Sequence, residues 1–358
     1  MKYMIQKSLK EVPMVKKIVL ITMMIALVSA FAFANGGGDA AATESAGNES
    51  IQLSWSSIST PDTALSKSMQ KFKFEVERLS GGRISADLYN GGQIFTQEGE
   101  LSAAREGTLD MAYYAAGWVA EWVPYLGQLN AVYTFTGYDH MRSVYSDPEI
   151  WEKIVSDVSE KVGVRPLAAF YLGTRELNLV ESVGEVRHPD QMSGVKLRTP
   201  NSPNWIALGK ALGANPTPMS FGEVYMGLKT GVVEGQDNPL PTDRIQKFYE
   251  PTKYIVMTDH VVDTVWPSIN IARWNALSPG DQDILLEAIE IARLYNDELT
   301  RSREADDRAY LESQGIIFID DPDKKAFQEY AKWSYQNESQ NVSGDWDWDF
   351  YDKIQSLQ

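Results

Sequence analysis

The feature that most constrains the fold is a long stretch near the C-terminus without helix-breaking residues. Ser278 and Pro279 are residue types favoured at a helix N-cap and at the first helical position. Neither glycine nor proline then occurs from Asp281 to Gln314. At about 1.5 Å per residue this stretch would span about 51 Å, whereas a small domain is about 30 Å wide. We therefore predict one helix over about 279–314 that runs along two lobes; a helix broken near Asn296 is the alternative.

Two sets of strand and helix patterns precede this stretch. In each set, short apolar or alternating runs are separated by segments in which apolar residues have helical spacing. The predicted strands are 51–55, 84–89, 111–116, 164–171 and 195–198, and the predicted helices are 61–79, 96–106, 203–212 and 220–230. Strands that alternate with helices are typical of α/β domains with largely parallel sheets. The sequence thus predicts an α/β fold of two lobes, each a mixed, mostly parallel sheet with flanking helices.

The N-terminal residues 1–34 have the pattern of a secretory signal peptide. Two lysines precede an apolar run over residues 18–33, and Ala32-Phe33-Ala34 supplies the small residues of a cleavage site. The run is shorter than the roughly 20 residues that a membrane-spanning helix needs, so a retained anchor is only the alternative. Residues 35–50 are expected to form a disordered spacer, and Met14 is an alternative start. We expect secretion across the inner membrane into the periplasm, with the signal peptide cleaved.

The charge balance excludes several classes of partner. The 358-residue chain has 33 basic and 49 acidic residues and a formal charge of −16. Removal of the signal peptide would take away five lysines and one glutamate and leave −20. Proteins bind nucleic acids and anionic membranes largely through Lys and Arg. A chain with this large a negative charge is therefore disfavoured as a partner of either. We therefore expect no nucleic-acid partner.

The sequence lacks the residue patterns of common catalytic and metal centres. It has no cysteine, which excludes disulfides, thiolate nucleophiles and cysteine zinc sites. The three histidines, His140, His188 and His260, do not have the spacing of a metal motif, and no GxGxxG, P-loop or GxSxG pattern occurs. We expect these histidines to be surface or core residues. The chain is expected to have no metal, no cofactor and no enzymatic activity.

The segment from Gly194 to Pro239 carries the most informative motifs. Gly-Val-Lys-Leu-Arg-Thr-Pro over 194–200 puts Arg198 at the end of a predicted strand, where open α/β sheets bind ligands. A guanidinium pairs with a carboxylate through two parallel hydrogen bonds and stays charged at every relevant pH. Downstream, residues 231–239 read Gly-Val-Val-Glu-Gly-Gln-Asp-Asn-Pro.

With Gly-Ala-Asn-Pro at 213–216 and Glu-Gly-Thr-Leu-Asp-Met at 106–111, these motifs resemble the DctP-type solute-binding proteins of TRAP (tripartite ATP-independent periplasmic) transporters. The resemblance covers nearly all of the mature chain. It implies a periplasmic-binding-protein clamshell whose lobes share a long helix and which delivers a small organic anion to a membrane permease. We assign lobe I to 51–172 plus 264–296 and lobe II to 173–263 plus 297–358.

The resemblance also implies site residues. Arg198 would grip the ligand carboxylate, Arg175 would be a second arginine at the crossing into lobe II, and Asn238 would contact the ligand. Aromatic and polar candidates for the rest of the pocket are Trp118, Tyr113, Tyr225, Trp266, Glu98, Gln236 and Ser57. Several tryptophans with polar partners would suit a sugar acid, whereas a C4-dicarboxylate would need a second cation such as Arg175. The sequence leaves open a uronate, an aldonate, a C4-dicarboxylate or a 2-oxo acid.

The predicted function is therefore that of a monomeric extracytoplasmic binding protein that captures a small organic acid for a TRAP permease. Two alternatives belong to other classes. One is a secreted hydrolase or lyase that acts on an anionic substrate with Asp and Glu as acid and base. The other is a ligand sensor that reports to a membrane receptor instead of a permease.

Overall fold

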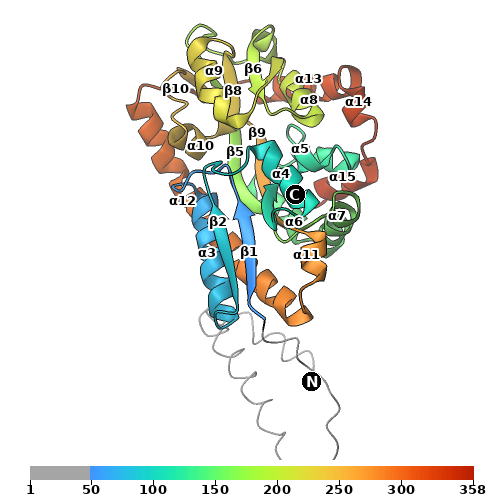
Figure 1. Cartoon of the computed structure of the whole chain (residues 1–358). Helices are drawn as coiled ribbons and strands as arrows, with labels where there is room; N and C mark the ends of the chain where they lie inside the picture. The colour runs from blue at the N-terminus through green and yellow to red at the C-terminus, as the bar shows by residue number, and fades with distance from the viewer. Residues whose placement is uncertain (1–48) are drawn as a thin grey trace, which may run out of the picture. The chain divides into compact units, whose positions relative to one another are not determined.

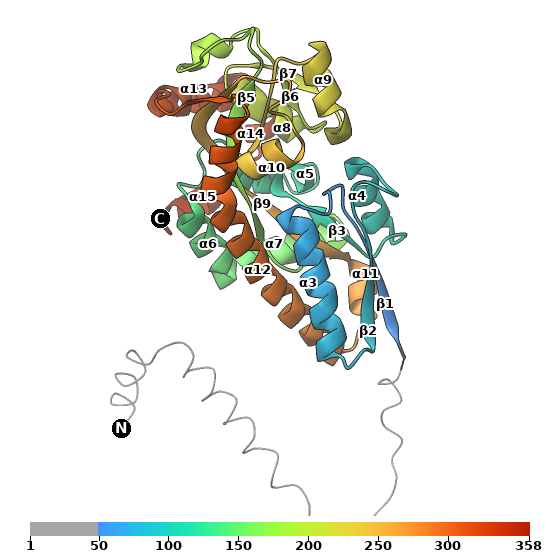
Figure 2. The same ribbon diagram turned by 90° about the vertical axis from the view of Figure 1, so that its left-hand side faces the viewer.

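The computed structural model describes residues 49–358 (Figures 1 and 2). The predicted signal peptide and nearly all of the predicted spacer lie outside the described residues. Among the described residues, none of the helices has both the length and the apolar character needed to cross a membrane.

The first half of the described chain contains strands β1 to β6 with the helices between them and α8 after them. In chain order they are β1 (Ile51–Ser56), α3 (Ala64–Leu79), β2 (Ile84–Tyr89), α4 (Gln97–Glu106), β3 (Met111–Tyr114), α5 (Ala116–Val119), the 3-10 helix η1 (Pro124–Asn130), α6 (Tyr138–Ser146), α7 (Pro148–Lys161), β4 (Val164–Pro166), β5 (Phe170–Leu179), η2 (Pro189–Met192), β6 (Lys196–Thr199) and α8 (Pro203–Ala211).

The second half contains the longest strand and the longest helix of the described chain. Its elements are β7 (Asn215–Pro218), η3 (Phe221–Glu223), α9 (Val224–Thr230), β8 (Gly235–Pro239), α10 (Leu240–Ile245), β9 (Tyr254–Asn270), α11 (Ile271–Asn275), α12 (Pro279–Ser313), β10 (Ile317–Ile319), α13 (Lys324–Asn337), α14 (Gln340–Ser343) and α15 (Trp348–Gln355).

The strands form one mixed arrangement in the order β2-β1-β3-β9-β5-β8-β6-β7, with β4 and β10 beside β9. At one end β1 pairs in parallel with β2 and β3, and at the other end β6 pairs in parallel with β7 and β8. Between these ends, the long strands β5 and β9 run antiparallel to each other and join the two parts. The predicted two-lobed α/β fold is confirmed, and the antiparallel pairing is concentrated where the lobes meet (Figure 1).

The predicted long helix is confirmed as α12, which at 35 residues is about 52 Å long. The Ser278 side chain caps it by accepting a hydrogen bond from the Asp281 amide at 3.2 Å. The helix continues through the position of the alternative break, because Asn296 and Asp297 there bind another element. Asn296 Nδ2 donates to the Tyr171 carbonyl at 2.7 Å, and the Tyr171 amide donates to Asp297 Oδ1 at 2.9 Å. These polar side chains therefore fasten the middle of α12 to β5.

The predicted lobe boundaries at 172/173 and 263/264 stay a prediction. In the structure Gly173 on β5 lies opposite Asp263 on β9, so the two predicted crossings are neighbours. The C-terminal helix α15 contacts residues that the prediction gave to the other lobe: the Phe350 and Tyr125 ring centroids lie 4.9 Å apart. Phe350 and Ile354 are four residues apart on one helix face, and both are buried in that contact.

The predicted helix over 220–230 is wrong at its start. The structure has the 3-10 turn η3 before α9, and the Ser220 side chain makes no cap hydrogen bond there. The tight turn instead places Phe221 against the cavity described below.

Gly173 on β5 generates a first prediction. The backbone φ of Gly173 is +127°, in a region that only glycine adopts readily, and a Cβ added to Gly173 would lie 2.5 Å from Pro239 Cβ. Gly184 has φ +81°, and no atom lies within 4 Å of a Cβ added there. Alanine at Gly184 would therefore have the same kind of backbone strain but no steric clash. We expect Gly173→Ala to destabilise the protein by clearly more than the roughly 1–2 kcal/mol expected for Gly184→Ala. Urea unfolding of both variants measures this, and equal losses would contradict it.

Candidate solute-binding site

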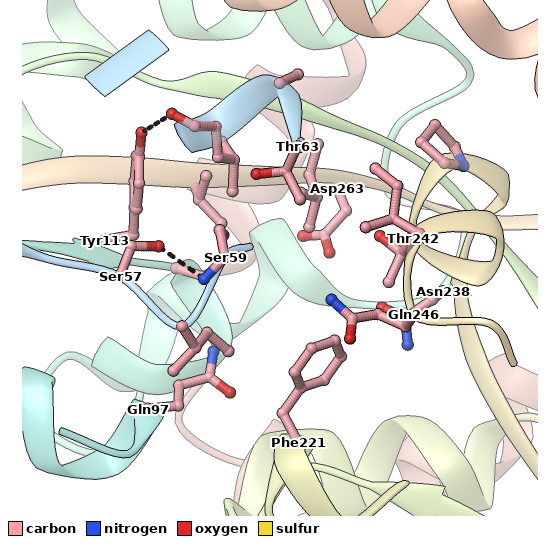
Figure 3. A pocket seen from close by; sticks show the side chains of 18 of the residues that line it. Ser57, Ser59, Thr63, Gln97, Tyr113, Phe221, Asn238, Thr242, Gln246 and Asp263 are labelled. Carbon is pink, nitrogen blue, oxygen red and sulfur yellow. Dashed lines mark hydrogen bonds between the residues drawn. The ribbon is translucent and has the colours of Figure 1, made fainter. Parts of the chain in front are cut away.

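A cavity of about 140 Å³ lies between the segments that follow β1, β3 and β6. This is smaller than the roughly 300–1,000 Å³ of drug-sized sites, so the cavity suits a small solute. One wall comes from the β1–α3 segment, α4, β3 and α5, and the other from β6, η3, β8 and α10. Figure 3 shows Ser57, Ser59 and Gln97 of the first wall across from Phe221 and Asn238 of the second.

Arg198 lies in the second wall at the end of β6 and is 2% exposed. Its Nε donates to the Met219 carbonyl at 3.0 Å, and its guanidinium lies 5.7 Å from the centre of the Phe221 ring. Among the described residues no carboxylate forms an ion pair with it, and its terminal nitrogens have no hydrogen-bond partner. Burial lowers the pKa of Arg198 to about 10, although the negative charge of Asp237 partly opposes this. The site therefore holds a buried cation that lacks an anion.

Arg175 also lines the cavity, but its charge is already neutralised. Its Nε donates to Asp237 Oδ2 and its Nη1 to Asp263 Oδ2, each at 2.7 Å. The guanidinium also lies 4.6 Å from the centre of the Trp205 ring. Burial raises the pKa of Asp237, but Arg175 and His260 lower it more, to about 2. Arg175 thus joins β5 to β8 and β9, and its predicted contact with a ligand stays a prediction.

The structure places the three histidines as expected, in the core or at the surface. His260 is fully buried, with Nε2 at 3.2 Å from Asp237 Oδ2. His140 is buried against the Ile354 carbonyl at 2.9 Å, and His188 caps η2 at the surface. Among residues 49–358 no cluster of three His, Asp or Glu side chains has the geometry to hold a metal ion.

Asn238 lies in the second wall on β8 and is 4% exposed. Its Nδ2 donates to Gln236 Oε1, and Gln236 Nε2 donates to Asp243 Oδ1 at 2.7 Å. Gln236 is fully buried behind the wall and does not line the cavity. The predicted site residue Gln236 therefore orients Asn238, whose own contact with a ligand stays a prediction.

Three further predicted residues line the cavity from the first wall. Trp118 on α5 and Tyr113 on β3 supply aromatic surface, and Ser57 follows β1. The Tyr113 hydroxyl donates to the Leu65 carbonyl at 3.1 Å, and Ser57 Oγ accepts from the Ser59 amide at 3.0 Å (Figure 3). The Tyr113 hydroxyl proton is thus already engaged.

The remaining predicted residues lie outside this cavity. The Tyr225 hydroxyl binds Glu250 at the surface of α9. Trp266 is fully buried in the core, where its ring lies 6.1 Å from that of Tyr145. Glu98 on α4 lines a neighbouring groove with Trp122. These candidates were chosen by residue type, which does not show which way a side chain points.

Several residues of the cavity escaped the sequence prediction. They include Phe221, Trp205, Gln97, Gln246 and Glu100. Glu100 is the most unusual, because it is 2% exposed and its Oε2 has no hydrogen-bond partner among the described residues. Burial raises its pKa well above the usual range, although the Ser56 hydroxyl and the Ile58 amide oppose this. The sequence gave a weak indication that Glu100 faces inward. Glu100 lies three residues after Gln97 on α4, and Leu101 and Ala104 on the same helix are apolar.

The fold and the site together define an α/β binding protein that encloses a small solute between two walls. The chain belongs to the bacterial extracellular solute-binding protein family 7 (DctP), whose model matches residues 55–341. The predicted resemblance is therefore confirmed. Arg198 and Asn238 both fall inside the matched region.

Relatives and solved structures agree with this family. A solute-binding protein of Roseobacter denitrificans is 32% identical over 318 residues, which is 89% of this chain and 92% of the relative. The sialic acid-binding periplasmic protein SiaP of Vibrio cholerae is 31% identical over 75% of this chain and 82% of its own. A TRAP periplasmic solute-binding protein of Roseobacter denitrificans, solved with bound 3-deoxy-D-manno-oct-2-ulosonic acid, has a TM-score of 0.80 and 32% identity, covering 87% of this chain and 100% of that one. Another protein of the same kind and organism, solved with bound L-galactonate, has a TM-score of 0.77 and 31% identity, and the match covers 86% of this chain and 99% of that one.

The Arg175 network generates a second prediction. Arg175→Ala would leave Asp237 and Asp263 buried without their shared cation, which typically costs about 3–5 kcal/mol. Arg187 pairs with Glu185 and Asp321 at the surface, so Arg187→Ala is expected to change stability by no more than about 0.5 kcal/mol. Denaturant unfolding of both variants measures the difference. A loss in Arg175→Ala as small as that of the control would contradict a structural role.

Glu100 generates a third prediction. A carboxyl whose pKa is raised on folding favours the folded state at low pH, and this contribution is lost as the pH rises above the ordinary value of about 4.3. Glu100→Gln removes the titration and keeps the shape. We expect its stability relative to the unaltered protein to increase between pH 5 and pH 8, by up to about 1.4 kcal/mol per pH unit. Unfolding measured at several pH values tests this, and a constant difference would refute it.

Proposed function

We propose that this protein captures a small organic acid, specifically a sugar acid, in the cavity and delivers it to a TRAP-type permease. The observation that carries the proposal is Arg198, a buried guanidinium without an ionic partner among the described residues. Holding a charge away from water costs several kcal/mol unless a counter-charge approaches it. A ligand carboxylate supplies that counter-charge and pairs with the guanidinium through two hydrogen bonds.

Two features favour a sugar acid over a dicarboxylate. A dicarboxylate needs a second cation, and the buried Arg175 is not free because it is already paired with Asp237 and Asp263. Arg303 on α12 also lines the cavity, but it is only partly buried, so water weakens its attraction for a second carboxylate. The cavity also combines aromatic surface, from Trp118 and other rings, with many hydroxyl and amide groups. Similar proteins were solved with bound 3-deoxy-D-manno-oct-2-ulosonic acid, L-galactonate and β-D-glucuronate. These ligands all carry a carboxylate and several hydroxyl groups.

The proposed role is transport without chemical change of the solute. The chain's family consists of extracellular solute-binding proteins. This supports an extracytoplasmic location, and the N-terminal signal pattern favours export to the periplasm. The solute recovered after long incubation with the protein should therefore be chemically unaltered.

The test of the proposal is a fourth prediction, on Arg198. Calorimetry with protein that has been unfolded, dialysed and refolded should detect binding of D-glucuronate, L-galactonate or a related sugar acid. We expect Arg198→Ala to weaken the tightest binding by about 2–5 kcal/mol, because the ligand carboxylate loses its partner. Arg198→Lys keeps the charge but loses the planar fork, and it should recover only part of the affinity.

Arg187→Ala is the matched control, since that arginine is exposed and lies outside the cavity. It should bind the same acid as tightly as the unaltered protein. The proposal fails if no sugar acid binds, and the assignment of Arg198 fails if Arg198→Ala binds with unchanged affinity.

A further inference from the structure

Glu100 is a buried acid in the wall opposite Arg198. It lies in the first turn of α4 and lines the cavity, whereas Glu98 on the same helix lines the neighbouring groove. Only 2% of Glu100 is exposed. The groups that act on its carboxyl are the Ser56 hydroxyl at the end of β1, the Ile58 amide just after it, and the Glu98 carboxylate, whose like charge adds to the effect of burial.

Buried carboxylates of the described chain are held in different ways. Glu176 and Asp243 lie outside the cavity and have no ion pair among the described residues, but they accept hydrogen bonds from the Asp259 amide and from Gln236. Others have cationic partners. Glu75 pairs with Lys71 and Arg78, and Asp237 pairs with Arg175. No lysine, arginine or histidine of the described residues forms an ion pair with Glu100, and its Oε2 is buried without a hydrogen bond. A buried polar atom without a partner is costly and rare in folded proteins. A group that arrives with the ligand would satisfy it.

The chemistry of that group follows from the acid. A carboxyl group accepts hydrogen bonds from hydroxyl groups, and when protonated it also donates one. When Glu100 is ionised, a second ligand carboxylate beside it is disfavoured, because two buried like charges repel each other. The cavity thus presents an unpaired cation on one wall and an unpaired carboxyl on the other.

We propose that Glu100 binds a hydroxyl group of the solute and thereby selects polyhydroxy acids with a single carboxylate. This inference rests on the proposed function, in which Arg198 holds the carboxylate. A site with a buried group that requires a hydrogen bond rejects analogues without the matching hydroxyl, because the group is then left unpaired. Glu100 is therefore a specificity-determining residue, and Arg198 provides the affinity for the acid.

The experiment compares a sugar acid with its monodeoxy analogues. The tightest binder of the panel above is titrated by calorimetry, followed by the same acid with one hydroxyl at a time replaced by hydrogen. We expect one analogue to bind the unaltered protein at least about tenfold more weakly. In Glu100→Leu the parent acid should bind more weakly, and removal of that same hydroxyl should change the Kd less than about twofold.

Two controls separate this role from a structural one. Glu106→Leu alters an exposed glutamate at the other end of the same helix, outside the cavity, and should keep the tenfold preference for the parent acid. Glu100→Gln keeps a hydrogen-bonding group and should keep part of that preference. Thermal unfolding checks that each variant is folded. If Glu100 had only a structural role, Glu100→Leu would weaken the binding of the parent acid and of the analogue equally.

The outcomes are distinguishable. If no analogue shows a preference that depends on Glu100, while Arg198→Ala still abolishes binding, this inference is wrong and the proposed function stands. If the unaltered protein binds no sugar acid, the proposed function is wrong and this inference falls with it.

Discussion

The ion pairs of Arg175 are the interaction on which the rest of the site depends. One guanidinium on β5 binds Asp237 on β8 and Asp263 on β9, so it ties together the strands that join the two parts of the fold. Because Asp237 and Asp263 are paired with Arg175, neither of them forms an ion pair with the nearby Arg198, although the charge of Asp237 still acts on it. The two arginines therefore differ in their environment. Arg175 connects the strands through its ion pairs, whereas Arg198 has no ion pair among the described residues and, in the proposed function, is available to a solute.

The sequence predicted the parts of the fold that depend on local chemistry. The cap at Ser278 and the absence of glycine and proline were enough for α12, because both act within one helix. The partners of Arg175 were not predictable in this way, since Asp237 and Asp263 lie 62 and 88 residues further along the chain. Residue type suggested Trp266 for the pocket, but its place on β9 directs it into the core. Glu100 was overlooked because the apolar residues near it on α4 are too weak a pattern to show that a glutamate is buried.

The cavity is also closed by contacts between its walls. Ser202 Oγ donates to the Gly117 carbonyl at 3.0 Å, and Asn204 Nδ2 donates to the Gly127 carbonyl at 3.4 Å. These bonds connect the start of α8 with α5 and η1. Arg198 is 2% exposed. In the proposed function we therefore expect a solute as large as a sugar acid to reach it only when the walls separate, so that the bonds across the walls break and form again with each binding event.

The strength of these bonds fits such a cycle. A hydrogen bond of this kind contributes a net of only about 0.5–1.5 kcal/mol, because the same groups bind water when the walls are apart. Two such bonds therefore favour the closed arrangement weakly. A carboxylate on Arg198 acts away from water and contributes more, so it shifts the balance toward closure. Because α12 is fastened to β5 through Asn296 and Asp297, we expect this motion to be confined to the segments around the cavity. In the proposed function the solute would complete the charge balance of the closed form, and binding and closure would be coupled for that reason.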